Sequence, residues 1–237
     1  MQKAIIVGAT SGIGKSLALL LADNGYKVGI IGRRENLLAE LHTEKPNTFY
    51  SLAFDVTANG LEENLQILTK QLDGLDLLIF SAGIGELNKD LNIDLELPTI
   101  DVNVKAFNKV VIWAFHYFEK QKTGQIAVIS SIAGLRGGGI APAYNASKAY
   151  QINYLEGLRQ KVRKQKLAIS ITDARPGFVD TAMAKAEEKF WMATPEKAAL
   201  QIFNAIKTKK NVIYITKRWR IIAWFLKLMP SYLYERI

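Results

Sequence analysis

A tyrosine and a lysine stand four residues apart in the segment YNASK, at Tyr144 and Lys148. On one face of a helix, residues with this spacing are neighbours. An unperturbed phenol has a pKa of about 10, and a nearby ammonium favours its ionised form, so the pair could move a proton near neutral pH. Ser131 ends an apolar run earlier in the chain, where its hydroxyl could bind a substrate oxygen. The alternative is an ordinary surface pair, because this spacing is frequent by chance.

A glycine-rich stretch, GATSGIGKS, joins the first apolar run to a helical pattern at residues 8–16. Gly8, Gly12 and Gly14 allow a tight turn in which the backbone approaches a pyrophosphate at a helix N-terminus. The ending GKS also resembles the loop of nucleoside triphosphatases, which need a carboxylate at a nearby strand end to hold Mg²⁺. The strands expected to end at residues 80–81 and 130–131 end in neutral residues instead. Dinucleotide binding is therefore favoured over phosphoryl transfer or a turn without a ligand, and Lys15 becomes incidental.

Two arginines, Arg33 and Arg34, follow the second apolar run. Folds that bind NAD tend to place an acid here, about 20 residues past the glycine loop, to bond the ribose 2′-hydroxyl. A guanidinium instead matches a 2′-phosphate in a bidentate way. The pair therefore favours NADP(H) over NAD, with the start of a solvated helix as the alternative interpretation.

Apolar runs rich in Val and Ile alternate with helical patterns along the chain, which predicts a doubly wound α/β fold with parallel strands. The runs are 4–8, 27–32, 76–83, 125–131, 167–174 and 211–216. The helical patterns are 13–23, 34–44, 60–72, 98–121, 143–165 and 195–209. No linker or repeat interrupts them, so we expect one domain over residues 1–216 and a helical tail over 217–237.

The formal net charge of +9 is concentrated near the C-terminus, where residues 207–237 carry eight Lys/Arg and one Glu. The tail KRWRIIAWFLKLMPSYLYERI is typical of a basic amphipathic helix that contacts a membrane surface, or that packs on the domain or on a second subunit. No apolar stretch reaches the roughly 20 residues that a spanning helix needs. No reading motif accompanies the charge, so nucleic acid is not expected as a partner.

The chain of 237 residues contains no cysteine and two histidines, and no His/Asp/Glu cluster has the spacing of metal ligands. We therefore expect no metal site. Lack of cysteine fits a reducing compartment, and the short N-terminal apolar run leads straight into the glycine loop. We expect a cytoplasmic protein without a signal peptide.

Taken together and in order, these motifs resemble the short-chain dehydrogenase/reductase family over roughly residues 2–216. The resemblance implies a single Rossmann domain with a mostly parallel seven-stranded sheet and helices on both faces. It implies a catalytic set of Asn103, Ser131, Tyr144 and Lys148. It implies NADP(H) contacts at Gly8, Thr10, Ser11, Gly12, Ile13, Gly14, Arg33, Arg34, Asp55, Val56, Ser81, Ala82, Gly83, Tyr144, Lys148, Pro176, Gly177, Val179 and Thr181.

The resemblance also implies a mechanism, in which a hydride passes between the nicotinamide and the carbon of a carbonyl or alcohol. Tyr144 exchanges the proton and Ser131 bonds the substrate oxygen. Lys148 lowers the tyrosine pKa and bonds the nicotinamide ribose, and Asn103 holds a water in a proton relay. The other hypothesis is a non-catalytic dinucleotide-binding redox sensor. The family pattern departs here at Val7, where a threonine is usual, and at the FSAG segment, residues 80–83, which has Phe and Ser in place of two asparagines.

The partners implied are a small apolar carbonyl or alcohol substrate and a second copy of the chain. A homodimer or homotetramer would form through the helices at 98–121 and 143–165. An apolar lining of the substrate site is expected from Phe178, Met183, Phe190, Trp191 and Met192, with the flexible segment 135–143 as another wall. The alternative is that the aromatic residues at 190 and 191 belong to the core.

Overall fold

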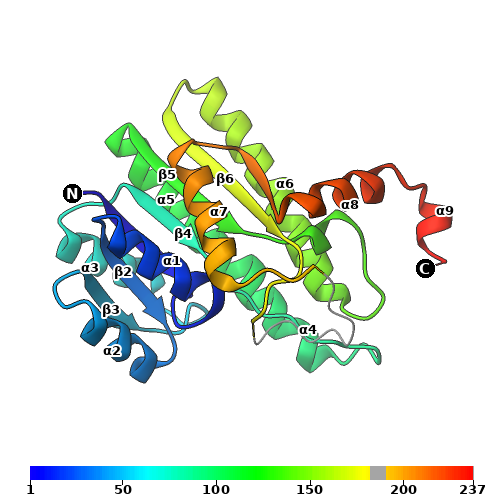
Figure 1. Cartoon of the computed structure of the whole chain (residues 1–237), viewed down its shortest axis with the longest axis horizontal. Helices are drawn as coiled ribbons and strands as arrows, with labels where there is room; N and C mark the ends of the chain where they lie inside the picture. The colour runs from blue at the N-terminus through cyan, green and yellow to red at the C-terminus, as the bar shows by residue number, and fades with distance from the viewer. Residues whose placement is uncertain (182–190, 237) are drawn as a thin grey trace.

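A computed structural model describes residues 1–181 and 191–236. Its centre is one sheet of seven parallel strands in the order β3-β2-β1-β4-β5-β6-β7 (Figure 1). The strands are β1 Lys3–Val7, β2 Lys27–Gly32, β3 Phe49–Ala53, β4 Leu77–Phe80, β5 Thr123–Ile129, β6 Ala168–Pro176 and β7 Val212–Ile215. The predicted doubly wound α/β fold is confirmed.

Helices connect the strands and close with a C-terminal pair. They are α1 Gly12–Asp23, α2 Glu35–Glu44, α3 Leu61–Leu72, α4 Ile93–Ile100, α5 Phe107–Gln121, α6 Pro142–Lys164, α7 Pro195–Lys207, α8 Lys217–Leu228 and α9 Ser231–Tyr234. A π-helical turn, Asp101–Ala106, joins α4 to α5, and a 3₁₀ turn, Ile132–Leu135, follows β5.

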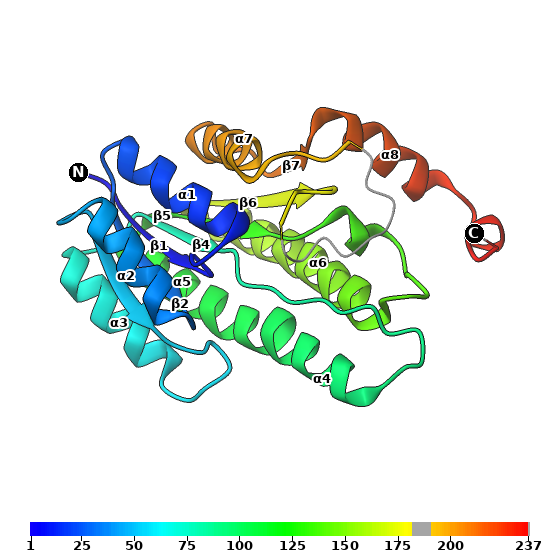
Figure 2. The same ribbon diagram turned by 60° about the horizontal axis from the view of Figure 1, so that its bottom comes forward.

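Side chains of successive strand residues enter opposite cores, as the pleat requires. In β1, Ala4 and Ile6 face a core completed by α1, α2 and α7, whereas Ile5 and Val7 face a core completed by α3, α5 and α6. Figure 2 shows these two helical layers on either side of the sheet. Cover on both faces explains why the strands read as continuous apolar runs.

The order of the strands in the sheet reverses direction between β1 and β4. These two strands lie side by side although β2 and β3 come between them in the sequence. Connections leave these two strands in opposite directions, so a crevice opens at their carboxyl ends. The glycine loop after β1 and the segment after β4 therefore lie at one edge of the sheet.

Two elements differ from the patterns in the sequence. Strand β3 is not among the apolar runs, since only Phe49 of this edge strand is buried and its last two outward positions, Ser51 and Ala53, are exposed. The helix expected over 98–121 starts earlier, at Ile93, and its path is interrupted by the π-helical turn. That turn carries Asn103, and such irregularities are frequent at functional sites.

The C-terminal tail packs on the domain through one side of α8. Trp219 and Ala223 of this helix are buried. Arg136 donates to the main-chain carbonyls of Leu226 at 2.8 Å and of Met229, so a cation meets the free carbonyls at the C-terminal end of α8. Within the described part of the chain, no helix has the length and hydropathy needed to cross a membrane.

Candidate active site

A cleft of about 850 Å³ opens at the carboxyl ends of the strands. It is lined by every residue of the predicted cofactor and catalytic sets except Gly14 and Asn103. Those residues come from the loops after β1, β2, β3, β4, β5 and β6 and from α6. Lys15, the residue that suggested a triphosphatase, does not line the cleft.

The glycine loop fits a dinucleotide because side chains are excluded where the backbone must come close. Gly8 has φ +92°, and a Cβ there would lie 2.5 Å from the Ala82 nitrogen. Gly14 is buried beneath the loop, and a Cβ there would overlap the Gly8 carbonyl. The first turn of α1 then presents its free N–H groups toward the cleft, where they suit a pyrophosphate.

Arg34 is already held against the glycine loop. Its guanidinium donates to the Thr10 hydroxyl at 2.7 Å and to the Ser11 hydroxyl at 2.7 Å. Arg33 is mostly exposed and lies 3.8 Å from a carboxylate oxygen of Asp55. The Thr57 backbone N–H chiefly holds the pKa of Asp55 below its usual range, and Arg33 contributes less. Two cations therefore border the end of the cleft at β2, where the acid typical of NAD binding is absent.

Tyr144 and Ser131 meet at the centre of the cleft. Burial raises the pKa of the Tyr144 phenol, and a hydrogen bond with the Ser131 side chain acts in the opposite direction. The Ser131 oxygen also accepts from the Ala133 N–H at 3.1 Å, which fixes its position. Lys148 lies 5.8 Å from the centre of the Tyr144 ring. The expected lowering of the tyrosine pKa by Lys148 stays a prediction, since burial dominates here.

Lys148 is buried, and its ammonium donates to two acceptors in the chain. It donates to the Ile129 carbonyl at 3.0 Å and to the Gln151 side-chain oxygen at 3.1 Å. Burial lowers the pKa of Lys148 to about 8, while the carboxylate of Asp173 acts to raise it. Gln151 was missed in the sequence, although it stands one helical turn after Lys148 and so projects from the same face.

Asn103 serves the site by bracing it. Its side-chain oxygen accepts from the Ile84 N–H at 3.0 Å, and its amide donates to the Ile84 carbonyl at 2.8 Å and to the Ser147 hydroxyl at 3.0 Å. Its main-chain carbonyl accepts from Gln151 at 2.8 Å. The amide has no further N–H to donate. The water expected on Asn103 stays a prediction, and that role would have to share an acceptor already used.

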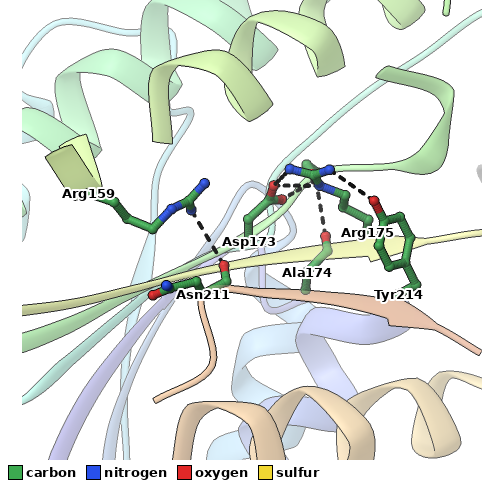
Figure 3. Close-up of polar contacts among 7 residues, drawn as sticks. Arg159, Asp173, Ala174, Arg175, Asn211 and Tyr214 are labelled. Atoms are coloured by element: carbon green, nitrogen blue, oxygen red, sulfur yellow. Dashed lines mark hydrogen bonds and ion pairs between the residues drawn. The ribbon is translucent and has the colours of Figure 1, made fainter. Parts of the chain in front are cut away.

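A buried ion pair of Asp173 and Arg175 lies on β6 (Figure 3). The carboxylate of Asp173 is 2.7 Å from the Arg175 guanidinium, and both side chains are almost completely buried. Ser130 donates to Asp173 at 2.5 Å, and Arg175 donates to the Tyr214 hydroxyl at 3.1 Å. The network links β5, β6 and β7 directly beneath the loop that carries Ser131.

Phe80 and Ser81 stand at the positions where the family resemblance leads us to expect two asparagines. Phe80 is fully buried and packs edge-on against Phe107, with ring centres 5.5 Å apart. The Ser81 N–H donates to the Val7 carbonyl at 2.8 Å, which extends the β1–β4 ladder by one residue. Apolar packing and a backbone bond therefore hold this segment.

The far end of the cleft is apolar and includes the C-terminal tail. Phe178, Ile140, Leu87, Leu226 and Tyr234 line it. Of the other residues expected there, Trp191 is half-exposed and packs edge-on against Trp219 rather than lining the cleft, and Met192 is not among the lining residues. Met183 and Phe190 lie outside the described residues.

The sequence profile of the short chain dehydrogenases matches residues 2–190. The chain belongs to the short chain dehydrogenase family. This short chain dehydrogenase is 33% identical over 188 residues to an uncharacterized oxidoreductase of Myxococcus xanthus (strain DK1622), which covers 77% of the chain and 74% of that protein. An uncharacterized oxidoreductase of Staphylococcus aureus (strain MW2) is 31% identical over 187 residues, covering 77% and 80%.

The fold of this short chain dehydrogenase is shared with a solved structure. A short chain dehydrogenase from Bacillus anthracis matches with a TM-score of 0.82 at 19% identity, covering 90% of this chain and 94% of the other. The protein is thus an oxidoreductase of a family that binds nicotinamide dinucleotides.

Proposed function

We propose that this short chain dehydrogenase interconverts a carbonyl and an alcohol with NADP(H). The observation that carries the proposal is the convergence of Ser131, Tyr144 and Lys148 in the cleft that also contains the glycine loop. A redox sensor that only binds a dinucleotide has no need of a buried phenol beside a serine hydroxyl and an ammonium. The enzyme is therefore favoured over the sensor.

The residues divide the work of carbonyl reduction. Ser131 donates to the substrate oxygen and preorganises the site for the charge that develops there. Tyr144 gives its proton to that oxygen, and Lys148 stabilises the phenolate that remains. Bound NADPH supplies the hydride, and the loop from Gly8 to Gly14 with Pro176–Thr181 would hold it. In alcohol oxidation the same groups act in reverse, with Tyr144 as the base.

The preference for the phosphorylated cofactor rests on Arg33 and Arg34. The hydroxyls of Thr10 and Ser11 hold Arg34 in place before any ligand arrives, so little conformational freedom is lost when it binds an anion. A 2′-phosphate at this end of the cleft would meet both cations, whereas a 2′-hydroxyl would bring no negative charge to the Arg34 guanidinium.

The proposed function is tested with a panel of ketones, aldehydes and acyl carbonyls, followed by the loss of NADPH absorbance. We expect turnover of apolar carbonyl compounds by the wild type and none by Tyr144→Phe, while NADPH still binds to the variant. Turnover retained in Tyr144→Phe would remove Tyr144 from the mechanism. Tight NADPH binding without turnover of any carbonyl would favour the sensor.

We also propose that the enzyme is a homodimer or homotetramer formed through α4, α5 and α6. Exposed apolar side chains on these helices support this, among them Leu97, Ile100, Ile112 and Tyr150. Monomeric proteins rarely gather exposed apolar side chains without an interaction that covers them.

Peripheral contact of residues 217–237 with an anionic membrane is proposed on the geometry of α8. Each residue of a helix turns by about 100°, so four apolar side chains lie opposite the packed Trp219. These form the outer stripe: Ile221, Trp224, Phe225 and Leu228, which are between 58% and 61% exposed. The exposed cations Arg218, Arg220 and Lys227 flank the stripe on both sides. An apolar stripe between cations suits the headgroup region of an anionic bilayer.

A second copy of the chain is the weaker candidate for the outer stripe. A two-fold interface would bring the same cations of both copies together, and α8 has no acidic residue to compensate them. The cleft is lined by Leu226 on the other side of the same helix. Membrane contact would therefore place the apolar end of the cleft beside the bilayer, where an apolar carbonyl compound is concentrated.

A further inference from the structure

Gln151 forms a fixed bridge between two predicted catalytic residues. It lies on α6, and its side chain is completely buried, with 0% exposure. Its NH₂ group donates to the main-chain carbonyl of Asn103 at 2.8 Å, and its oxygen accepts from the Lys148 ammonium at 3.1 Å. A buried amide with a bond at each end costs little, whereas one left without partners would be strongly destabilising.

The chemistry of the two partners fixes the orientation of the Gln151 amide. A carbonyl oxygen can only accept a hydrogen bond and an ammonium can only donate, so the NH₂ group must face Asn103 and the oxygen must face Lys148. The π-helical turn helps, since it contains Asn103 and turns the carbonyl out of regular α-helical bonding. The bridge therefore has one stable arrangement.

Within the described residues, the bridge leaves Lys148 with one N–H that has no acceptor. Of its three N–H groups, one goes to the Ile129 carbonyl and one to Gln151. The remaining N–H is available to a third acceptor, and the Tyr144 ring centre lies 5.8 Å from the ammonium nitrogen. The two fixed acceptors thus determine where the ammonium group of this flexible side chain lies.

We propose that Gln151 is a positioning residue, which holds the Lys148 ammonium toward Tyr144 by anchoring it to the main-chain carbonyl of Asn103. This bridge uses one lone pair of the main-chain carbonyl of Asn103, the residue to which the family resemblance assigns a water. The proposal deepens the proposed function and rests on it only for the role of Lys148 in turnover. The position of the ammonium follows from the contacts of the chain itself.

Titratable and charged groups also surround Lys148. Tyr144 faces it from the same helix, and Asp173 acts on it from β6. Arg175 pairs with Asp173 at 2.7 Å and so offsets much of that charge. Replacing the neutral Gln151 therefore changes a hydrogen-bond partner of Lys148 and leaves Tyr144, Asp173 and Arg175 in place.

The test is a pH titration of Lys148 in the full chain, read from the ¹³Cε signal of labelled lysine, with Lys148→Met to identify that signal. Gln151→Met keeps the length of the side chain but removes the acceptor, so the midpoint should fall by about one pH unit. Gln151→Glu places a carboxylate beside the ammonium, so the midpoint should rise by a similar amount. Gln160→Met and Gln160→Glu, at an exposed position of the same helix, should leave it unchanged.

Opposite shifts in the two Gln151 variants support the bridge. Equal midpoints in wild type and variants, or shifts of both variants in one direction, would overturn it and leave Gln151 as a packing residue. If Gln151→Met does not fold, as thermal unfolding would show, Gln151→Glu still decides, because an unchanged or lowered midpoint contradicts the bridge. These readouts need no turnover, so failure of the proposed function would appear separately, in the carbonyl panel.

With an active substrate, the same variants separate positioning from binding. We expect Gln151→Met to lower kcat about 10-fold with little change in KM for NADPH, since the misplaced ammonium acts mainly on the developing phenolate. A rise in KM at unchanged kcat would contradict a positioning role.

Discussion

Burial shifts the pKa values of Tyr144 and Lys148 in opposite directions. Exclusion of water raises the pKa of the phenol and lowers that of the ammonium to about 8, because each charged form loses its hydration. The phenol thus rests protonated, which suits the donation of a proton to a carbonyl oxygen. The positive charge of Lys148 is lost in mildly alkaline solution, and on the proposed mechanism the stabilisation of the phenolate is lost with it.

This arrangement predicts how the activity depends on pH. Because the pKa of Lys148 is lowered, its charge disappears at a lower pH than that of an ordinary lysine. We expect kcat/KM for NADPH, which reports on the free enzyme, to fall as pH rises through about 8. The measurement is initial rates of carbonyl reduction from neutral to alkaline pH. A plateau that extends to the ordinary lysine range, about 10.4, would contradict this expectation.

Arg34 offers a second prediction at the residue scale. Removing one charge-assisted contact with a phosphate costs roughly 1.5–3 kcal/mol, so Arg34→Ala should raise KM for NADPH about 10-fold or more and leave KM for NADH nearly unchanged. Arg33→Ala should act in the same direction. Arg163→Ala, near the C-terminal end of α6, is the control. Equal changes with both cofactors would show that these arginines do not recognise the 2′-phosphate.

Helix α8 has two apolar sides with different fates. Trp219 and Ala223 are buried against the domain, while the outer stripe faces away from it. The periodicity of the tail indicated a basic amphipathic helix, but the sequence did not show which apolar side would be covered. That choice depends on Arg136 and Gly177, which are distant in sequence and contact the helix only in the folded chain.

Substitution of the outer stripe tests membrane contact without disturbing the packed side. We expect the wild type to float with vesicles of anionic lipid, and Trp224→Ser/Phe225→Ser to remain largely unbound. Ile67→Ser, an exposed apolar position on α3, is the matched control and should float like the wild type. Equal flotation of all three proteins would refute the role of the stripe, and binding to an acidic protein but not to vesicles would assign it to a protein partner.

At the scale of the whole molecule, the fold and most of the site could be predicted. Continuous Val/Ile runs need cover on both faces, so they implied the parallel sheet, and the loops at its carboxyl edge implied the cleft. Gln151 could not be found, because a glutamine on a helix has no signal of its own until Asn103 is brought opposite by another helix. Strand β3 could not be found for a different reason. It lies at the edge of the sheet, where fewer of its side chains need to be apolar.

Assembly provides the prediction that belongs to the whole molecule. If α5 forms part of a subunit interface, Ile112→Asp should lower the mass measured by light scattering after size exclusion, because a buried charge without a partner is costly. Ile67→Asp on α3 should keep the wild-type mass. A wild-type protein that is monomeric at all concentrations tested would rule out this interface.

The contact between Gly177 and Trp219 can form only late in synthesis, because the two residues are far apart in the sequence. The Gly177 N–H donates to the Ile215 carbonyl at 2.7 Å, and a side chain at Gly177 would overlap Trp219. Both partners, Ile215 and Trp219, follow Gly177 in the sequence and are translated after it, since synthesis starts at the N-terminus. A ribosome-bound chain therefore carries Tyr144 and Lys148 long before the segment that would hold the nicotinamide is covered. We expect the packing around Gly177 to form only after α8 has left the ribosome.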